Sequence, residues 1–302
     1  MVRSFTTACA ALSLAVFALW SMSAAAQDAN RLDLDDPTDA FLAFQKMNCS
    51  LTEGETIIYW WQGSMMSRIE GERDRHLFNV QGMNIRQCEV YQDDRRGPGF
   101  RLATREIMLY LDPETNELLS TWTNPWTGEE VDVIHVANDP VSMEKPFYAF
   151  DEKRKPFEWS PVIKNGRVID MSMTPLFYEN PLGGAYQEYE GGHYHAMEMT
   201  TLFAYEDDLL DGDKPTLDKQ TLAWARVSDW LPWMKMGGRQ GMVFFSTVGT
   251  RAQSLDELPE PMRGALETTY ATWKEPPPLD DDRPDETSWT YFKKIIDQKT
   301  QD

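Results

Sequence analysis

The sequence predicts an all-β fold with peripheral helices, in which about ten strands form a single large antiparallel β-barrel. Segments rich in β-branched and aromatic residues recur from residue 55 to residue 251. Turn signals such as EGERD, DDRRGPG and DPETNE separate them, which favours antiparallel hairpins. No linker or repeat divides the region, and closing the sheet hides its edges. A two-sheet sandwich is the alternative.

The expected elements follow from local patterns. Residues 36–49 predict a helix, because Pro37 suits the first turn and Phe41, Phe44 and Met47 recur at helical spacing. Residues 258–273 and 288–298 predict two more helices, separated by a Pro/Asp linker over 275–286. The expected strands are 55–69, 76–91, 100–112, 117–124, 130–139, 146–153, 168–179, 193–206, 221–233 and 240–251.

The N-terminal residues predict export. Arg3 precedes a short apolar stretch, and Ala24-Ala25-Ala26 fits a cleavage site after Ala26. The expected organisation is a signal peptide (1–26), a β-barrel domain with its short N-terminal helix (27–253) and a C-terminal helical extension (254–302). The mature chain is expected in the periplasm or outside the cell, without a membrane span.

The net charge limits the binding partners to be expected, and the cysteine content indicates one possible disulfide. The chain carries a formal net charge of −20, which disfavours binding to nucleic acid. Cys49 and Cys88 remain after cleavage and are candidates for one disulfide in an oxidising compartment, although their spacing alone leaves the pairing open.

Several motifs together are specific: LDPETNE, NPWTGE, HVANDPV and WLPWMKMG. With the segments around them, from about Asp36 to Arg251, they resemble the domain-of-unknown-function family number 1838 of exported bacterial proteins. This resemblance implies no reaction, catalytic residue or cofactor, so the chemistry must be argued from residues.

The segment GGHYHAMEM (191–199) contains half of the four histidines. On a strand, His193, His195, Met197 and Met199 share one face, and Glu198 lies on the other. If the histidine face points inward, the imidazoles form an acid/base pair in a cavity. A cupin-type site is disfavoured because Glu198 faces away, whereas the two imidazoles and two thioethers match Cu(I) as a minor metal alternative.

Three further polar residues complete the candidate site. Arg105 is the candidate holder of an anionic group, with solvent exposure as the alternative. Asp229 is the acid nearest to a Trp-rich loop, and His135 is either a core histidine or a ligand contact. The candidate substrate-binding residues are Tyr59, Trp60, Tyr194, Trp230, Trp233 and His135, with the aromatic ones expected around the cavity.

These features lead to one functional hypothesis and two alternatives. The chain is expected to be a cofactor-independent enzyme of the lyase, isomerase or hydratase type that acts on a hydrophobic, aromatic or isoprenoid-like molecule. Its catalytic residues would be His193, His195, Arg105 and Asp229. A calycin- or lipocalin-like barrel can also act as a non-catalytic carrier. The minor alternative is a Cu(I)-binding protein, and a homo-oligomer remains open.

Overall fold

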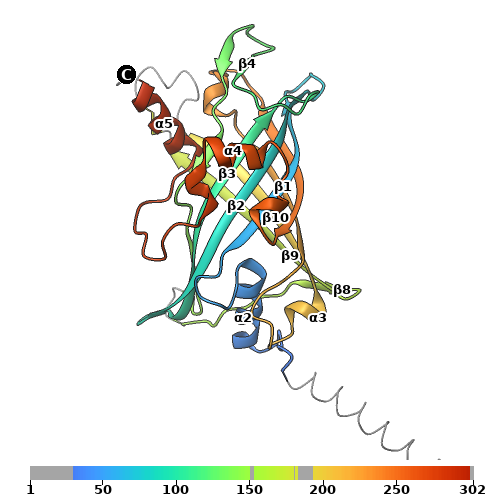
Figure 1. Ribbon diagram of the computed structural model, residues 1–302, viewed down its shortest axis with the longest axis vertical. Coiled ribbons are helices and arrows are strands. Elements are labelled where there is room, and N and C mark those ends of the chain that lie inside the picture. The colour runs from blue at the N-terminus through green and yellow to red at the C-terminus, as the bar shows by residue number, and fades with distance from the viewer. Residues whose placement is uncertain (1–29, 150–152, 180, 183–192, 300–302) are drawn as a thin grey trace, which may run out of the picture.

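Ten antiparallel strands form one strongly curved sheet in the computed structural model, which describes residues 30–149, 153–179, 181–182 and 193–299 (Figure 1). The strand order is β6-β3-β2-β1-β12-β11-β10-β9-β8, and β7 also pairs with β3. The sheet strands are β1 (Ile57–Arg68), β2 (His76–Asp93), β3 (Gly97–Leu111), β6 (Val136–Asn138), β7 (Met143–Pro146), β8 (Val162–Lys164), β9 (Arg167–Glu179), β10 (His193–Tyr205), β11 (Gln220–Ser228) and β12 (Met242–Ala252). A separate hairpin contains β4 (Thr121–Thr123) and β5 (Glu130–Asp132).

The helices lie at the ends and on the outside of the sheet. The α-helices are α2 (Pro37–Asn48), α3 (Glu206–Leu209), α4 (Met262–Thr268) and α5 (Ser288–Lys299). Short 3₁₀ helices are η2 (Pro232–Met234), η3 (Leu255–Glu257) and η4 (Ala271–Lys274). None of the helices in the described ranges is long and apolar enough to cross a membrane. The predicted signal peptide (1–26) lies outside those ranges.

The pairing of β1 with β12 joins two meanders. Strands β1 to β3 follow one another in the sheet, as do β8 to β12, and the β1–β12 ladder runs from Ile58 opposite Ala252 to Arg68 opposite Met242. The strands approach closely at two glycines: a Cβ on Gly249 would lie 2.0 Å from the Trp60 carbonyl oxygen, and one on Gly63 2.0 Å from that of Ser246. Only glycine fits this contact without displacing backbone.

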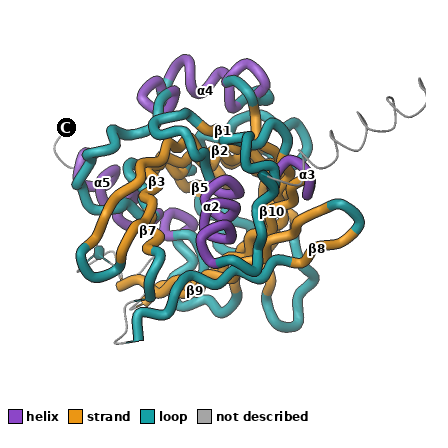
Figure 2. Tube along the Cα trace, turned by 90° about the horizontal axis from the view of Figure 1, so that it is seen from below, coloured by secondary structure: helices purple, strands orange, loops and turns teal. Residues whose placement is uncertain are grey.

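The curved sheet surrounds helix α2 when the molecule is seen from below (Figure 2). The ladder of described strands ends at β6 and β7 on one side and at β8 on the other. The prediction of a mostly β chain built on one large antiparallel sheet is confirmed.

Local chemistry explains where the predicted elements match and where they differ. Helix α2 starts at Pro37 because the Asp36 side chain accepts hydrogen bonds from two backbone N–H groups of its first turn. The expected strand 146–153 is not found where it was expected: β7 spans Met143–Pro146, and residues 150–152 lie outside the described ranges. The expected helix 258–273 divides into α4 and η4 after the β-branched pair Thr268-Thr269.

Apolar side chains gather in three clusters around the sheet. One packs α2 into the lower end, with Phe41 and Phe100 among its members. A second, rich in tryptophan, fills the opposite end around Trp230 and Trp233. The third places α4 and η4 against the outer face of β1, β2 and β3. The C-terminal extension therefore covers part of the outer face of the sheet. The two end clusters do not fill the middle of the inner face, where the cavity lies.

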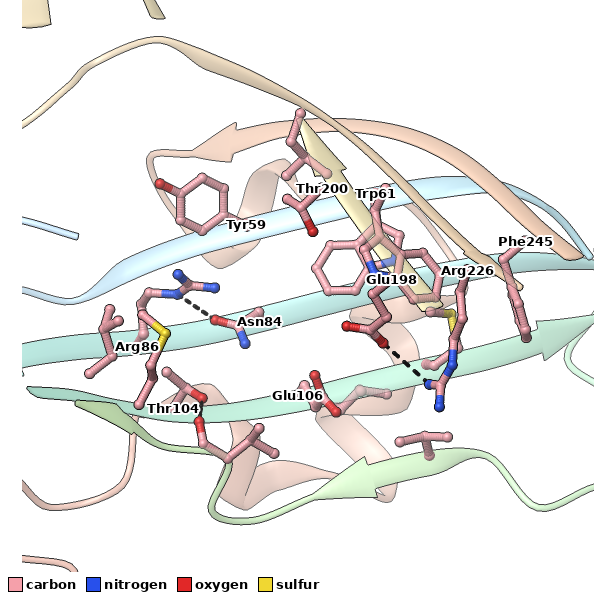
Figure 3. Close-up of a pocket in the computed structure, with 18 of the residues that line it drawn as sticks. Tyr59, Trp61, Asn84, Arg86, Thr104, Glu106, Glu198, Thr200, Arg226 and Phe245 are labelled. Carbon is pink, nitrogen blue, oxygen red and sulfur yellow. Dashed lines mark hydrogen bonds and ion pairs between the residues drawn. The ribbon is translucent and has the colours of Figure 1, made fainter. Parts of the chain in front are cut away.

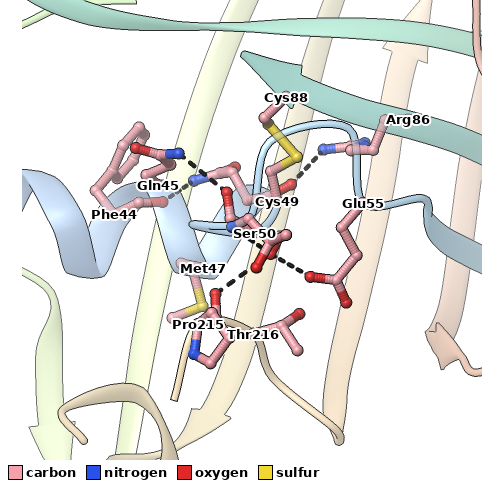
Figure 4. The surroundings of a disulfide bond; sticks show 12 residues. Phe44, Gln45, Met47, Cys49, Ser50, Glu55, Arg86, Cys88, Pro215 and Thr216 are labelled. Carbon is pink, nitrogen blue, oxygen red and sulfur yellow. Dashed lines mark hydrogen bonds between the residues drawn. A yellow bond between two sulfur atoms is a disulfide. The ribbon is translucent and has the colours of Figure 1, made fainter. Parts of the chain in front are cut away.

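Cys49 and Cys88 form a disulfide in the structure, with the two sulfur atoms 2.07 Å apart (Figure 4). Cys49 is the C-cap residue of α2, and Cys88 lies on β2. Both cysteines are buried, and the bond closes a separation of 39 residues. It attaches the helix to the wall of the sheet.

Replacing both cysteines with serine is expected to lower the free energy of unfolding by about 2–4 kcal/mol, because the unfolded chain regains the entropy of the closed loop. Urea unfolding of the oxidised wild type and the double variant measures the difference. Equal midpoints with equal slopes would contradict a stabilising bond.

Candidate functional site

A cavity of about 350 Å³ lies on the inner face of the sheet between the two end clusters (Figure 3). This volume is within the range of small-molecule sites. Its apolar and aromatic lining includes Tyr59, Trp61, Leu102, Met108, Tyr110, Leu222, Trp224 and Phe245. Its polar lining includes Asn84, Arg86, Thr104, Glu106, Asp170, Glu198, Thr200 and Arg226.

The strand period brings the polar side chains together. On β2 and β3, Asn84 lies opposite Glu106, and Arg86 lies opposite Thr104. On β10 and β11, Glu198 lies opposite Arg226. Alternate residues of a strand share a face. Strands β2, β3 and β10 therefore each place two polar side chains in the cavity, and β11 places Arg226 and the aromatic Trp224 there. In Figure 3, Glu198 extends from β10 toward the β3 side of the cavity, where Glu106 lies.

Glu198 and Arg226 form an ion pair in the cavity wall. Arg226 Nη1 lies 3.4 Å from Glu198 Oε1, and the two side chains are 12% and 27% exposed. Arg226 Nη2 donates a hydrogen bond to the Tyr194 hydroxyl at 3.2 Å. Burial is the largest single effect on Arg226 and lowers its pKa, but the attraction of Tyr194, Glu198, Tyr110 and Tyr178 together raises the pKa above its ordinary value. Both side chains of the pair are therefore charged, and their opposite charges neutralise each other.

Glu106 is a carboxyl group in a different electrostatic environment. Burial raises its pKa above the ordinary value, and the negative charge of Glu198 adds to this effect. Asn138 Nδ2 donates a hydrogen bond to Glu106 Oε1 at 2.8 Å, which opposes the rise only in part. Two carboxyl groups with unequal environments are the usual arrangement for acid and base roles in one site.

Two N–H donors in this region have no hydrogen-bond partner among the residues that the structure describes. Trp61 Nε1 and Arg226 Nε are both buried and unpaired. An unsatisfied buried donor costs about 1–3 kcal/mol. Both nitrogen atoms are covered by neighbouring protein atoms and do not face the open part of the cavity.

The histidine face of β10 points outward. His193 and His195 are exposed, whereas Tyr194, Ala196 and Glu198 turn inward. The Phe177 ring lies beside both imidazoles, with centroid distances of 4.6 Å and 4.9 Å. The predicted alternation is correct, but the inward histidine face that an acid/base pair in the cavity requires is not the one that the structure shows.

Asp229 and the two methionines lie on the same outer side. Asp229 Oδ2 accepts a hydrogen bond from the His195 backbone N–H at 2.8 Å and lies 3.1 Å from His195 Nδ1. Met197 and Met199 are half-buried there, and Met199 lies opposite Met173. Within the described ranges, no group of three or more His, Cys, Asp or Glu residues is placed to hold a metal.

Arg105 also faces away from the cavity. Its Nε donates to Asp139 Oδ1 at 2.7 Å, and its Nη1 donates to the carbonyl oxygens of Thr272 and Glu275. These bonds attach the C-terminal extension to β3. The expectation that Arg105 holds an anion inside the cavity is wrong, because neighbouring Glu106 occupies the inward position.

The predicted aromatic residues are divided among several places. Tyr59 lines the cavity and donates a hydrogen bond to Gln220 Oε1 at 2.6 Å. Tyr194 is buried next to Arg226. Trp60 faces the outer cluster, and its neighbour Trp61 faces the cavity instead. The other two predicted aromatic residues, Trp230 and Trp233, are buried in the upper cluster and do not line the cavity, although Leu231 between them does.

His135 is a structural histidine outside the cavity. Its Nδ1 accepts a hydrogen bond from the Tyr110 backbone N–H at 3.1 Å, and its ring stacks on that of Tyr110. Burial lowers its pKa to about 4, against the smaller effect of a hydrogen bond to the Leu119 backbone. His135 is therefore neutral at neutral pH and joins β3 to the segment before β4.

Four charged residues of the cavity lining were not among the residues predicted from the sequence: Glu106, Glu198, Arg86 and Arg226. All four are charged residues at positions that alternate with core residues on long strands. Charged residues on one face of several neighbouring strands, between core residues, are the signal in the sequence that could have located them.

A curved antiparallel sheet with a cavity on its inner face defines the class: a mostly β protein with a cavity of small-molecule size. Residues 54–296 match the family model described as "Protein of unknown function (DUF1838)". The chain belongs to this family, as its motifs predicted. No curated protein matches the chain.

The pKa of Glu106 is expected to lie above the ordinary 4.5 in the wild type and to fall in Glu198→Gln, because that change removes a nearby negative charge. A ¹³C NMR titration of the side-chain carboxyl measures both values. Glu70→Gln, at an exposed position, is the control and should leave the pKa unchanged. A wild-type pKa at or below 4.5 would refute this description of the site.

The burial of His135 predicts a loss of stability in acid. Its folded pKa of about 4 lies below the ordinary histidine value of 6.5, so the unfolded chain binds the proton first as the pH falls. The free energy of unfolding should decrease between pH 6.5 and 4 by up to about 3 kcal/mol on this account.

Urea unfolding at several pH values should give a smaller decrease for His135→Gln than for the wild type. His76→Gln, at an exposed position, should behave as the wild type does. The same pH dependence in all three proteins would assign the acid sensitivity to other groups.

Proposed function

We propose that this protein is a cofactor-independent enzyme that transfers a proton to or from a hydrophobic small molecule held in the cavity, with Glu106 as the acid/base residue. The raised pKa of Glu106, in a cavity that also contains the Glu198–Arg226 pair, carries this proposal. A buried carboxyl group that retains its proton nearer to neutral pH is a suitable general acid.

The other lining residues suit the same chemistry. Proton transfer from Glu106 to an alkene or to a leaving oxygen would generate positive charge on the substrate. The Glu198 carboxylate and the rings of Trp61 and Trp224 would stabilise that charge. Loss of a proton from a neighbouring atom then completes an isomerisation or elimination, and attack by water completes a hydration.

We further propose a shape for the binding cavity and a cellular compartment for the protein. The curved sheet would act as a barrel-like container of the calycin or lipocalin type, with α2 and the tryptophan-rich cluster as its two ends. The predicted signal peptide would place the reaction in the periplasm or outside the cell, and the Cys49–Cys88 bond suits an oxidising compartment.

A non-catalytic carrier is the second candidate. The aromatic part of the lining favours it, because Trp61, Trp224 and Phe245 can hold the hydrocarbon part of a ligand without any proton transfer to carbon. The two functions share the cavity and differ only in what Glu106 does.

Replacing Glu106 with Gln separates the two. The enzyme proposal expects turnover to fall by about 10²-fold or more with ligand binding retained, because Gln keeps the size and loses the transferable proton. The free energy of unfolding at pH 8 should stay equal or rise, since the raised pKa of Glu106 makes its ionised form a cost at that pH.

Native mass spectrometry of each protein purified from its own cells provides the readout before a substrate is known. The variant should retain an unconverted compound that the wild type releases or holds in converted form. Glu70→Gln is the matched charge control. The same bound compound in the wild type and in Glu106→Gln would favour the carrier and contradict the enzyme.

A further inference from the structure

Arg86 is a cavity-lining arginine at the α2 end of the inner face. Its Nε donates to Asn84 Oδ1 at 2.6 Å, and its Nη1 donates to the Asn48 carbonyl oxygen at 3.1 Å. Its guanidinium lies over the Tyr59 ring, 4.8 Å from the centroid. All these partners are formally neutral, so the described residues give Arg86 no carboxylate in contact.

The two cavity arginines therefore differ in how their charge is compensated. Arg226 has Glu198 as an ion-pair partner. For Arg86, burial lowers the pKa, and the attraction of Tyr59 and Glu106 does not restore it. Arg86 is partly buried, and a charge taken out of water without an opposite charge beside it carries a desolvation cost that a bound anion would offset.

We infer that the cavity binds an amphipathic monocarboxylic acid whose carboxylate contacts Arg86 and whose hydrocarbon part extends along Trp61 and Trp224. The guanidinium of Arg86 offers the forked donor geometry that a carboxylate accepts. Thr104, directly opposite Arg86 on β3, lines the same part of the cavity. This inference rests on the proposed function and specifies its substrate class.

The rest of the lining favours one negative charge over two. Glu106, Asp170 and Glu198 also face the cavity, so a phosphate dianion would meet carboxyl groups along its walls. Among the described lining residues Arg86 is the arginine without a carboxylate partner, which suits a single carboxylate.

The register also fixes where chemistry would occur on such a ligand. Arg86 and Asn84 are alternate residues of β2, and Glu106 lies opposite Asn84. Alternate positions on a strand are roughly 7 Å apart. The atom that exchanges a proton with Glu106 would then lie a few bonds from the carboxylate, in the hydrocarbon part of the molecule.

Competition with a neutral fluorescent probe tests the inference. N-phenyl-1-naphthylamine, which has no anionic group, is bound first, and decanoate or decan-1-ol is then added at pH 7.5. We expect decanoate to displace the probe at about a ten-fold or lower concentration than the alcohol, since a charged hydrogen bond to Arg86 is lost in the alcohol.

In Arg86→Gln this preference for the acid should disappear, while the probe still binds. Arg86→Lys should keep part of it, and Arg68→Gln, which removes an exposed arginine, should keep all of it. If Arg86→Gln does not fold, the comparison of decanoate with decan-1-ol in the wild type still tests whether the cavity prefers a carboxylate.

The outcomes separate this inference from the proposed function. Equal displacement by acid and alcohol in the wild type overturns the carboxylate assignment and leaves a cavity for neutral ligands. A preference that survives in Arg86→Gln assigns the anion to another group and also overturns it. Failure of the probe, the acid and the alcohol to bind, checked by calorimetry, overturns both proposals.

Discussion

The close pairing of β1 with β12 is the constraint on which the rest of the structure depends. Gly63 and Gly249 let the two backbones approach where any side chain would meet a carbonyl oxygen at 2.0 Å. This contact joins the meander that contains β3 to the meander that contains β10, within a single curved sheet. Glu106 and Glu198, which are far apart in the chain, line the same cavity as a result.

The inner face separates charge into three environments. Glu198 and Arg226 compensate each other, Glu106 is shifted toward its neutral form, and Arg86 keeps a charge that only neutral groups contact. A cavity wall with these properties is poorly suited to simple packing, because each buried polar group carries a desolvation cost. It is suited to a molecule that has both an anionic end and a hydrocarbon part.

The sequence predicts the strands and their alternation well, because side-chain period and turn chemistry are local. It does not predict which face is inward. On β10 the outer face carries Met197 and Met199 and so resembles a core face, whereas the inner face carries Glu198, since it borders a cavity. On β3 the same ambiguity led to Arg105 instead of Glu106. Orientation depends on the distant segments that cover each face, such as the Thr272 and Glu275 carbonyls that bind Arg105.

The most direct test of the inner face as the functional site is a crystal structure of the protein with decanoate at pH 7.5. The account predicts the carboxylate at Arg86 and the hydrocarbon chain passing Glu106 toward Trp61 and Trp224. Decanoate bound instead on the outer face of β9 and β10, beside His193 and His195, with nothing between Arg86 and Glu106, would contradict the account.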